Sequence, residues 1–388
     1  MLVPELDWLT SREAENIWPF AHRLGVLDEE HKWLEELVKR ARKEKGLLFL
    51  AGYLLGRAET GEQEWRDKLL DEWTQNEEDL SKAVLEATWR GDPSDSGAKR
   101  LAILVDKGWL EPQALSILMW GKWILGLGIR AFSELAERLM RDEGDLTTEA
   151  AMAILVQRLE VFPNEKDHLS NLSWSLIERE NAIFGSTMGT YYWKEIACNY
   201  LQDDPVRISK IILTGFEKIE SVILSDSECM EILREATKID PEPVWNEVSG
   251  VLLRKDNTSL RLKLALDKWY VTLIDLNFLL NWARKNEPWG PKILASLSPL
   301  GGEPLDELPR ELLIRYGDDK VVPYELMDNF QSGTFSGPMS SWLRGKIDVA
   351  KKWIDDEEPA VSKWAKELLE SLKKQHEKIG LQEEEERW

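Results

Sequence analysis

The sequence is poor in cysteine. Its 388 residues include two cysteines, Cys198 and Cys229, and they lack the CxxC spacing of a metal or redox motif. A disulfide scaffold is excluded, because such scaffolds depend on several conserved cysteine pairs. Both thiols fall in apolar helical patterns, which predicts two buried structural cysteines in a reducing compartment.

Long hydrophobic runs are also missing. The longest, within Ala114 to Ile129, is interrupted by Lys122. A membrane-spanning helix needs about 20 mostly apolar residues in succession. The first residues, MLVPELDW, lack the basic segment with which a signal peptide begins. We therefore expect a cytoplasmic protein.

Basic side chains are outnumbered. The chain has 50 lysines and arginines against 71 aspartates and glutamates, a formal net charge of -21. Such an excess of negative charge opposes direct binding to nucleic acid or to an anionic membrane. It favours a protein partner whose contacting surface is basic.

Known catalytic and metal-binding motifs are absent. No pair of histidines has the spacing of a zinc-binding helix; the four histidines are His22, His31, His168 and His376. Gly345-Lys346 is not part of a phosphate-binding loop. Phe335-Ser336-Gly337 lacks the spacing of a nucleophile elbow. We expect no catalytic residue, no metal and no cofactor, although an enzyme with an unrecognised site stays open as an alternative.

What the sequence does contain is a repeated signal for helix initiation. Aspartate followed by proline occurs at Asp92-Pro93, Asp204-Pro205 and Asp240-Pro241. The carboxylate can cap a helix, and proline fits its first turn. Starts and stops of this kind predict about 18 to 20 helices, with one helix pair roughly every 35 to 42 residues. No convincing strand alternation occurs. The pattern predicts an all-α fold, an α-solenoid of degenerate helix-turn-helix repeats similar to tetratricopeptide (TPR) or HEAT repeats.

Two local patterns predict how the helices pack. Residues 112–126 are apolar almost all the way round, which predicts a continuous helix buried between neighbours, with Trp120 and Trp123 in the core. Gly52 and Gly56 lie four residues apart, a spacing that predicts close contact between two helices. The run LAILVD, residues 101–106, is similar to the strand that holds magnesium in NTPases, but it follows a helix start.

Proline and glycine divide the chain. They are concentrated between Pro288 and Pro309, so we predict a helical-repeat array over residues 1–287, a bend over 288–310, a C-terminal helical cap over 311–380 and an acidic tail over 381–388. The last helix carries an apolar stripe on one face and highly charged residues on the opposite face. This is the pattern of the hairpin that caps a repeat array. The stripe comprises Val361, Trp364, Ala365, Leu368 and Leu372.

Three segments resemble a known family. They are GAKRLAILVDKGWLEPQALSILMWGKWILGL (residues 97–127), YYWKEI (191–196) and the C-terminal GTFSGPMSSWLRGKIDVAKKWIDDEEPAVSKWAKELLESLKKQ with its EEEER tail. They resemble the C-terminal helical-repeat arms of large bacterial STAND or NACHT-type NTPases, the antiphage-defence ATPases of the Avs kind. The likeness extends, with gaps, from about Gly46 to the end. This chain departs from the full pattern, because it has neither a phosphate-binding loop nor an effector domain.

The resemblance implies a function. In that family the arm binds a phage structural or packaging protein and so switches on an NTPase and its effector. This chain would then be the sensor that binds a phage packaging or portal-type protein, acting with a fused or separate NTPase or effector. A generic intracellular scaffold built on the same solenoid is the alternative.

Tryptophan is unusually common, with 19 residues against 7 tyrosines and 9 phenylalanines. Most of these rings are expected to fill the core between helices, and the remainder are candidate anchors for a partner. The candidate anchors are Tyr191, Tyr192, Trp193, Phe335 and Trp342. For each of them a place in the core stays open as the alternative.

Overall fold

The fold is all-α. A computed structural model describes residues 3–11, 14, 16–43, 46–183, 186–218, 226–333 and 336–385. Helices account for 77% of these described residues, and none of them forms a strand. The predicted fold class, a solenoid of paired helices, is confirmed.

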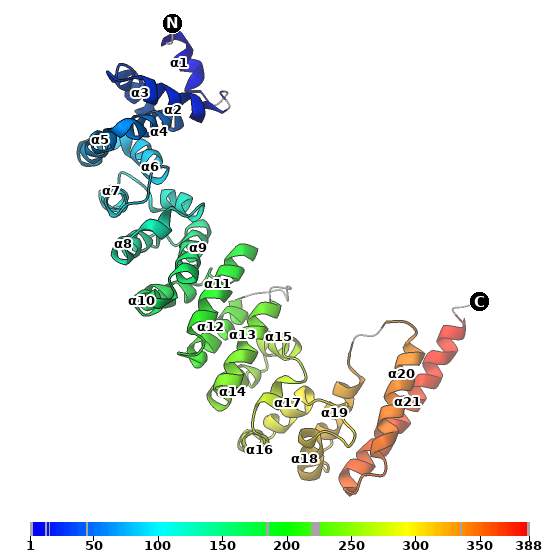
Figure 1. Ribbon diagram of the computed structural model, residues 1–388. Helices are drawn as coiled ribbons and strands as arrows, with labels where there is room; N and C mark the ends of the chain where they lie inside the picture. The colour runs from blue at the N-terminus through cyan, green and yellow to red at the C-terminus, as the bar shows by residue number, and fades with distance from the viewer. Residues whose placement is uncertain are drawn as a thin grey trace. The chain divides into compact units, whose positions relative to one another are not determined.

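The chain divides into two compact units, residues 1–199 and 200–388. The helices of the first unit are α1 (Val3–Leu9), α2 (Ile17–Leu27), α3 (Leu34–Ala41), α4 (Leu47–Arg57), α5 (Gln63–Asn76), α6 (Ser81–Trp89), α7 (Asp95–Asp106), α8 (Ile129–Leu139), α9 (Asp145–Val161), α10 (Lys166–Ile177) and α11 (Thr187–Tyr200), which ends one residue into the next unit. Figure 1 labels them in chain order.

The second unit continues the series. Its helices are α12 (Pro205–Lys218), α13 (Asp226–Ile239), α14 (Pro241–Leu252), α15 (Asn257–Ala265), α16 (Leu276–Lys285), α17 (Trp289–Leu297), α18 (Glu307–Tyr316), α19 (Val321–Gln331), α20 (Met339–Ala350) and α21 (Pro359–Glu385). The described part of the chain contains no helix long and apolar enough to cross a membrane.

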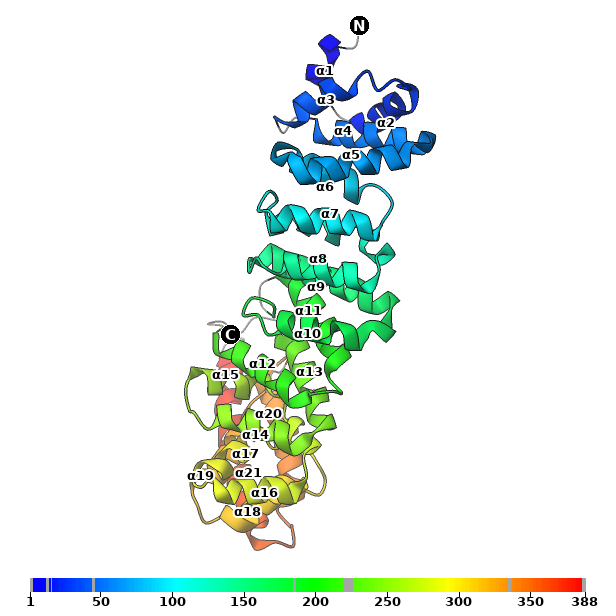
Figure 2. The same ribbon diagram turned by 90° about the vertical axis from the view of Figure 1, so that its left-hand side faces the viewer.

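Helices stack on their next-but-one neighbours. In the first unit α2 packs on α4 and α4 on α6, and in the second α12 packs on α14 and α17 on α19. Figure 2 shows the helices of the first unit from α4 to α9 lying one above another, roughly parallel. This is the packing of a repeat array, in which each helix pair buries its apolar faces against the adjacent pairs.

Hydrogen bonds between successive repeats show the period. In the first unit, side chains donate hydrogen bonds to groups that lie 31 to 39 residues earlier in the chain. The pairs are Lys107 to Thr74, Arg138 to Asp106, Arg158 to Leu127, Asn181 to Glu143 and Arg179 to Met140. These spacings overlap the predicted repeat of roughly 35 to 42 residues. The repeated unit is therefore one helix pair with its turns.

Two of the three expected aspartate-proline helix starts are confirmed. Pro205 and Pro241 are the first residues of α12 and α14. Asp204 Oδ1 accepts a hydrogen bond from the Arg207 main-chain N–H at 2.9 Å, whereas Asp240 occupies the N-cap position without the expected side-chain hydrogen bond. At Asp92-Pro93 the helix begins later, at Asp95. The cap there is Ser94, whose Oγ accepts from the Gly97 N–H at 3.1 Å. Ser94 has the extended backbone that a capping residue adopts.

The expected continuous helix over residues 112–126 is wrong. The segment forms two 3-10 helices, Pro112–Met119 and Trp123–Gly126. Between them Gly121 has a φ of 98°, a left-handed conformation that only glycine adopts readily. This break turns Trp120 outward, with 67% of its surface exposed, while Trp123 stays buried at 7%. Trp123 belongs to the core as expected, and Trp120 does not.

The bend and the cap are ordered by specific contacts. Within the predicted bend, residues 288–310, the segment Trp289–Leu297 is helix α17. The loop after it is held by Asp306, which accepts from the main-chain N–H groups of Gly301 and Gly302 at 3.1 Å each. The C-terminal hairpin is confirmed, because α20 packs on α21. The predicted apolar stripe of α21 is buried along its whole length. The helix continues to Glu385, into the predicted acidic tail.

The two cysteines differ in exposure. Neither forms a disulfide; Cys229 is buried as expected, but Cys198 is exposed, which corrects the expectation of two buried thiols. Cys198 lies on the outward face of α11.

Close contact between α2 and α4 depends on glycine. A Cβ atom at Gly56 would lie 2.1 Å from the His22 carbonyl oxygen, and one at Gly25 would lie 2.1 Å from the Tyr53 carbonyl oxygen. Main-chain atoms cannot move aside as a flexible side chain can. The close contact predicted from Gly52 and Gly56 is therefore confirmed.

Substitution of Gly56 tests this contact. We expect Gly56→Ala to destabilise the protein by about 1 to 3 kcal/mol, because the methyl group forces two helices apart. The matched control is Gly250→Ala in α14, where a Cβ atom would meet no atom within 4 Å. The control should raise stability by about 0.5 to 1 kcal/mol, since alanine favours a helix. Urea denaturation followed by circular dichroism measures both, and equal effects would contradict the close contact.

Candidate protein-binding surface

The predicted anchors on α11 fall into two classes. Tyr191 is 42% exposed and Tyr192 half-buried, and their rings meet edge to face with centroids 5.5 Å apart. Burial, together with the negative charge of Glu149, raises the pKa of Tyr192. Trp193 has no exposed surface, and its Nε1–H donates to the Ile177 carbonyl at 3.1 Å. Trp193 is a core residue, which corrects its place among the anchors.

The other two predicted anchors belong to the second unit. Trp342 lies half-buried on α20, where Lys346 Nζ is 5.4 Å from its ring centroid and 4.4 Å from that of Phe330. Burial and the nearby charge of Lys268 lower the pKa of Lys346. Phe335 falls outside the described residues. Trp342 therefore remains a candidate anchor with a cation beside it.

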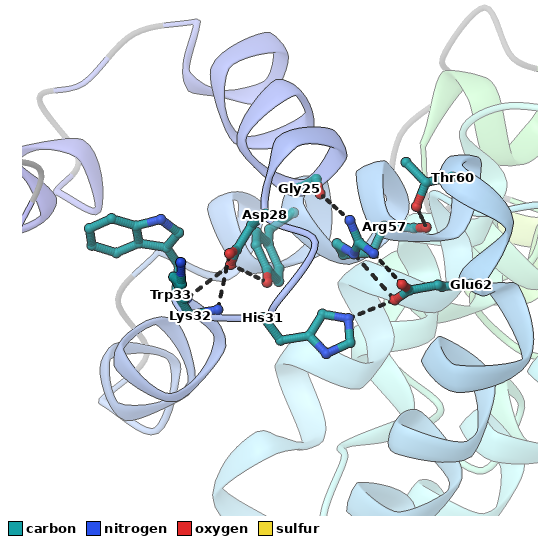
Figure 3. A network of polar contacts seen from close by, with 9 residues as sticks. Gly25, Asp28, His31, Lys32, Trp33, Arg57, Thr60 and Glu62 are labelled. Carbon is teal, nitrogen blue, oxygen red and sulfur yellow. Dashed lines mark hydrogen bonds and ion pairs between the residues drawn. The ribbon is translucent and has the colours of Figure 1, made fainter.

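A polar network joins the first helices of the chain (Figure 3). The Asp28 carboxylate accepts hydrogen bonds from the main-chain N–H groups of Lys32 and Trp33, at 3.0 and 2.9 Å, and from the Tyr53 hydroxyl at 2.8 Å. Burial alone would raise the pKa of Asp28, but these hydrogen bonds outweigh it and lower the pKa. Asp28 directly follows α2, and its carboxylate holds the turn between α2 and α3, which Tyr53 joins to α4.

The second half of the network centres on a buried arginine. Arg57 pairs with the Glu62 carboxylate and donates to the Gly25 carbonyl at 3.2 Å, as Figure 3 shows. His31 Nε2 lies 2.6 Å from Glu62 Oε2, and its ring stacks on Trp65 at 4.1 Å. The bond from Arg57 lowers the pKa of Glu62. The carboxylates of Asp28 and Glu62 thus both interact with neighbouring residues of the chain. The network therefore stabilises the turns that connect α2 to α5.

Removal of the Asp28 charge gives a pH-dependent result. We expect Asp28→Asn to cost about 1 to 3 kcal/mol at pH 7, because charge-assisted hydrogen bonds are lost. The pKa of Asp28 is lower in the folded than in the unfolded chain. The charge therefore stabilises the fold fully above the unfolded value of about 3.9, and this stabilisation disappears as pH falls through the folded pKa.

The measurement is urea denaturation of both proteins from pH 7 to pH 2.5. The difference in free energy of unfolding should shrink as the solution becomes more acidic. A difference that stays constant over this range would show that the charge of Asp28 has no part in the turn.

Two observations bear on metal and nucleotide binding. Within the described residues no cluster of three histidine, cysteine, aspartate or glutamate side chains is placed to hold a metal ion. The segment LAILVD, residues 101–106, lies inside α7, so it is not the strand that carries a magnesium ligand in NTPases.

Four tryptophans line a hollow on the first unit, and the sequence pattern singled out only Trp120 and Trp123 among them, as core residues. The rings come from Trp18 on α2, Trp89 at the end of α6, and Trp120 and Trp123 in the loop after α7. Arg90, Pro93, Lys122 and two glycines complete a hollow of ≈ 550 Å³. We call it the tryptophan notch. Its size lies within the roughly 300 to 1,000 Å³ typical of ligand sites.

One side of the notch is fixed by Glu86. Its Oε2 accepts hydrogen bonds from Trp89 Nε1 at 3.1 Å and from Arg90 Nε at 2.8 Å. The Arg90 guanidinium stacks 4.5 Å from the Trp89 ring centroid and 5.2 Å from that of Trp18. The carboxylate thus neutralises the arginine and orients both aromatic residues.

The opposite side is fixed from beneath by α9. Gln157 Nε2 donates to the Met119 carbonyl at 2.9 Å, and Arg158 Nη1 donates to the carbonyls of Ile124 and Leu127 at 3.3 and 2.8 Å. These bonds hold the loop on both sides of Trp120. The exposed ring is therefore presented by a loop of defined conformation.

Comparisons with known proteins add no family. No family model matches the chain, and no curated protein matches it at a significant level. Among solved structures, the crystal structure of an engineered protein shares 14% identity over 95% of this chain and 98% of that one, with a TM-score of 0.20. A TM-score this low carries no argument about fold or function.

Proposed function

We propose that this chain is a protein-binding helical-repeat module, and that it forms the target-recognition part of a bacterial antiphage defence system in the cytoplasm. Its target is a phage packaging or portal-type protein with a basic face, and binding triggers a linked or separate NTPase or effector. The defence role rests on the resemblance of three segments to the sensor arms of STAND and NACHT-type NTPases.

The observation that carries protein binding is the number of large aromatic rings exposed on a helical scaffold. Among them Trp120, Trp269 and Tyr324 expose 67%, 62% and 65% of their surface, and Tyr191 and Trp289 expose 42% and 41%. Tryptophan and tyrosine dominate the energetics of protein interfaces. A charge of -21 favours a basic partner and speeds its encounter.

Co-expression with individual phage proteins tests the proposal. The tagged chain should capture a packaging or portal-type protein, and association should slow as salt rises, because screening shortens the range of charge attraction to about 8 Å at physiological strength. Failure to recover any protein from a broad panel of phage packaging and structural proteins would remove the defence role. A complex insensitive to salt would remove the role of charge.

Variants of the predicted anchors locate the binding surface. We expect Tyr191→Ala and Trp342→Ala each to weaken capture on the order of tenfold, as loss of an aromatic anchor does. The control is Leu146→Ala, which removes an apolar side chain that is 50% exposed. Equal capture by all three variants would show that neither aromatic residue touches the partner.

A further inference from the structure

We propose that the tryptophan notch binds an extended, proline-containing peptide segment that carries a carboxylate side chain. The proposal rests on the proposed protein-binding function and names the part of a partner that this site accepts. The first observation concerns two hydrogen-bond donors of the notch. In the part of the chain the structure describes, neither the Trp120 indole N–H nor the Lys122 ammonium has a hydrogen-bond partner, and both residues are exposed.

The lining excludes two other classes of ligand. Tryptophan rings also stack on sugars, but sugar hydroxyls need carboxylate or amide partners, and the side chains that line the notch include neither. Nucleic acid also stacks on tryptophan, yet it needs several cations along its backbone. The notch offers Lys122 and an arginine already paired with Glu86. An apolar peptide surface suits the exposed parts of Trp18, Trp89 and Trp120 and the ring of Pro93.

The free indole N–H favours an extended ligand over a helical one. A helix uses its main-chain carbonyls in its own hydrogen bonds. An extended segment in the polyproline II conformation leaves its carbonyls free to accept from Trp120 Nε1–H, and its proline rings pack against aromatic side chains. Such a segment is already ordered before it binds, so less conformational entropy is lost.

The charge of the notch selects the carboxylate. Glu86 pairs with Arg90 at 2.8 Å, so the cation without a partner is Lys122. On a chain with a net charge of -21, an acidic peptide is repelled by most of the surface. A single carboxylate placed beside Lys122 is attracted locally, which fixes where along the peptide the acidic residue must lie.

The test uses the purified full chain and a synthetic library. The probes are fluorescein-labelled ten-residue peptides with proline at alternate positions, one fixed glutamate, and leucine or alanine elsewhere. We expect saturable binding by fluorescence anisotropy for members of this set. Replacement of the glutamate by glutamine should weaken binding about threefold to tenfold, and replacement of the prolines by alanine, which favours a helix, should abolish it.

Three variants assign the binding to the notch. Trp120→Ala should weaken binding at least about tenfold, and Lys122→Gln should remove the preference for glutamate over glutamine. Trp269→Ala, which removes a tryptophan of similar exposure in the second unit, should change nothing. Absence of saturable binding across the set, equal binding by the Trp120 variant, or tighter binding of the alanine peptides would each overturn the proposal.

The outcome is independent of the phage panel. Peptide binding without capture of any phage protein would support the notch as a peptide site and remove the defence role. Capture of a phage protein that persists in the Trp120→Ala variant, without peptide binding, would support the proposed function and overturn the notch as the site.

Discussion

Replacing Trp123 by alanine should cost about 3 to 5 kcal/mol of unfolding free energy, whereas replacing Trp120 should change it by no more than about 0.5 kcal/mol. The two residues lie three positions apart in an apolar run, but Trp123 is 7% exposed and Trp120 is 67% exposed. Removal of the buried ring leaves a cavity beneath the loop, while removal of the exposed ring leaves only water.

Urea denaturation of the two variants side by side provides the measurement. Each serves as the control for the other, because the chemical change is identical. A similar loss for both would show that Trp120 is enclosed, as the sequence pattern predicted. The expected result also establishes that Trp120→Ala is folded, so that its effect on peptide binding reports on contact and not on stability.

Replacing Arg158 by methionine should cost about 3 to 5 kcal/mol, because it leaves a carboxylate without its partner in a largely buried place. Arg158 is 2% exposed and forms two hydrogen bonds with Glu165, at 2.6 and 2.8 Å. Arg158 Nη1 donates to the carbonyls of Ile124 and Leu127, in the loop that carries Trp120. Loss of the guanidinium therefore affects the pair and the loop together.

A second substitution separates these effects. Arg158→Met combined with Glu165→Leu removes the unpaired charge, and we expect it to recover a large part of the lost stability. Arg130→Met is the matched control. It breaks a pair with Glu134 in which the arginine is 91% exposed, and such surface pairs contribute about 0.5 kcal/mol or less. If Arg158→Met lowered the free energy of unfolding no more than this control does, the buried pair would not contribute to stability.

The fold could be predicted from the sequence because repeated helices carry local signals. Proline after aspartate marked the first residues of α12 and α14, and the apolar stripe of the last helix identified its buried face. These signals depend on neighbours a few residues away. Residues 112–126 misled the prediction because a glycine that takes a left-handed conformation is not distinguishable in the sequence from one that continues a helix.

The candidate site was less predictable, because it depends on residues far apart in the chain. Tyr191 and Trp193 are near neighbours in an aromatic run, and only the direction of each side chain from α11 decides that one is exposed and the other buried. The tryptophan notch draws on residues 18, 89–93 and 120–123. No local pattern in any of these segments indicates the other two, and only the stacking of successive repeats brings them together.

The hydrogen bonds that span 31 to 39 residues have a consequence for how such a chain changes over evolutionary time. Because each repeat is joined chiefly to those beside it, a duplication or deletion of one whole period leaves the remaining junctions with the partners they require. The length of the array is then free to drift while its interfaces are preserved. A change of a few residues near such a junction, by contrast, shifts an arginine such as Arg158 or Arg179 away from the carbonyl to which it donates in the preceding repeat.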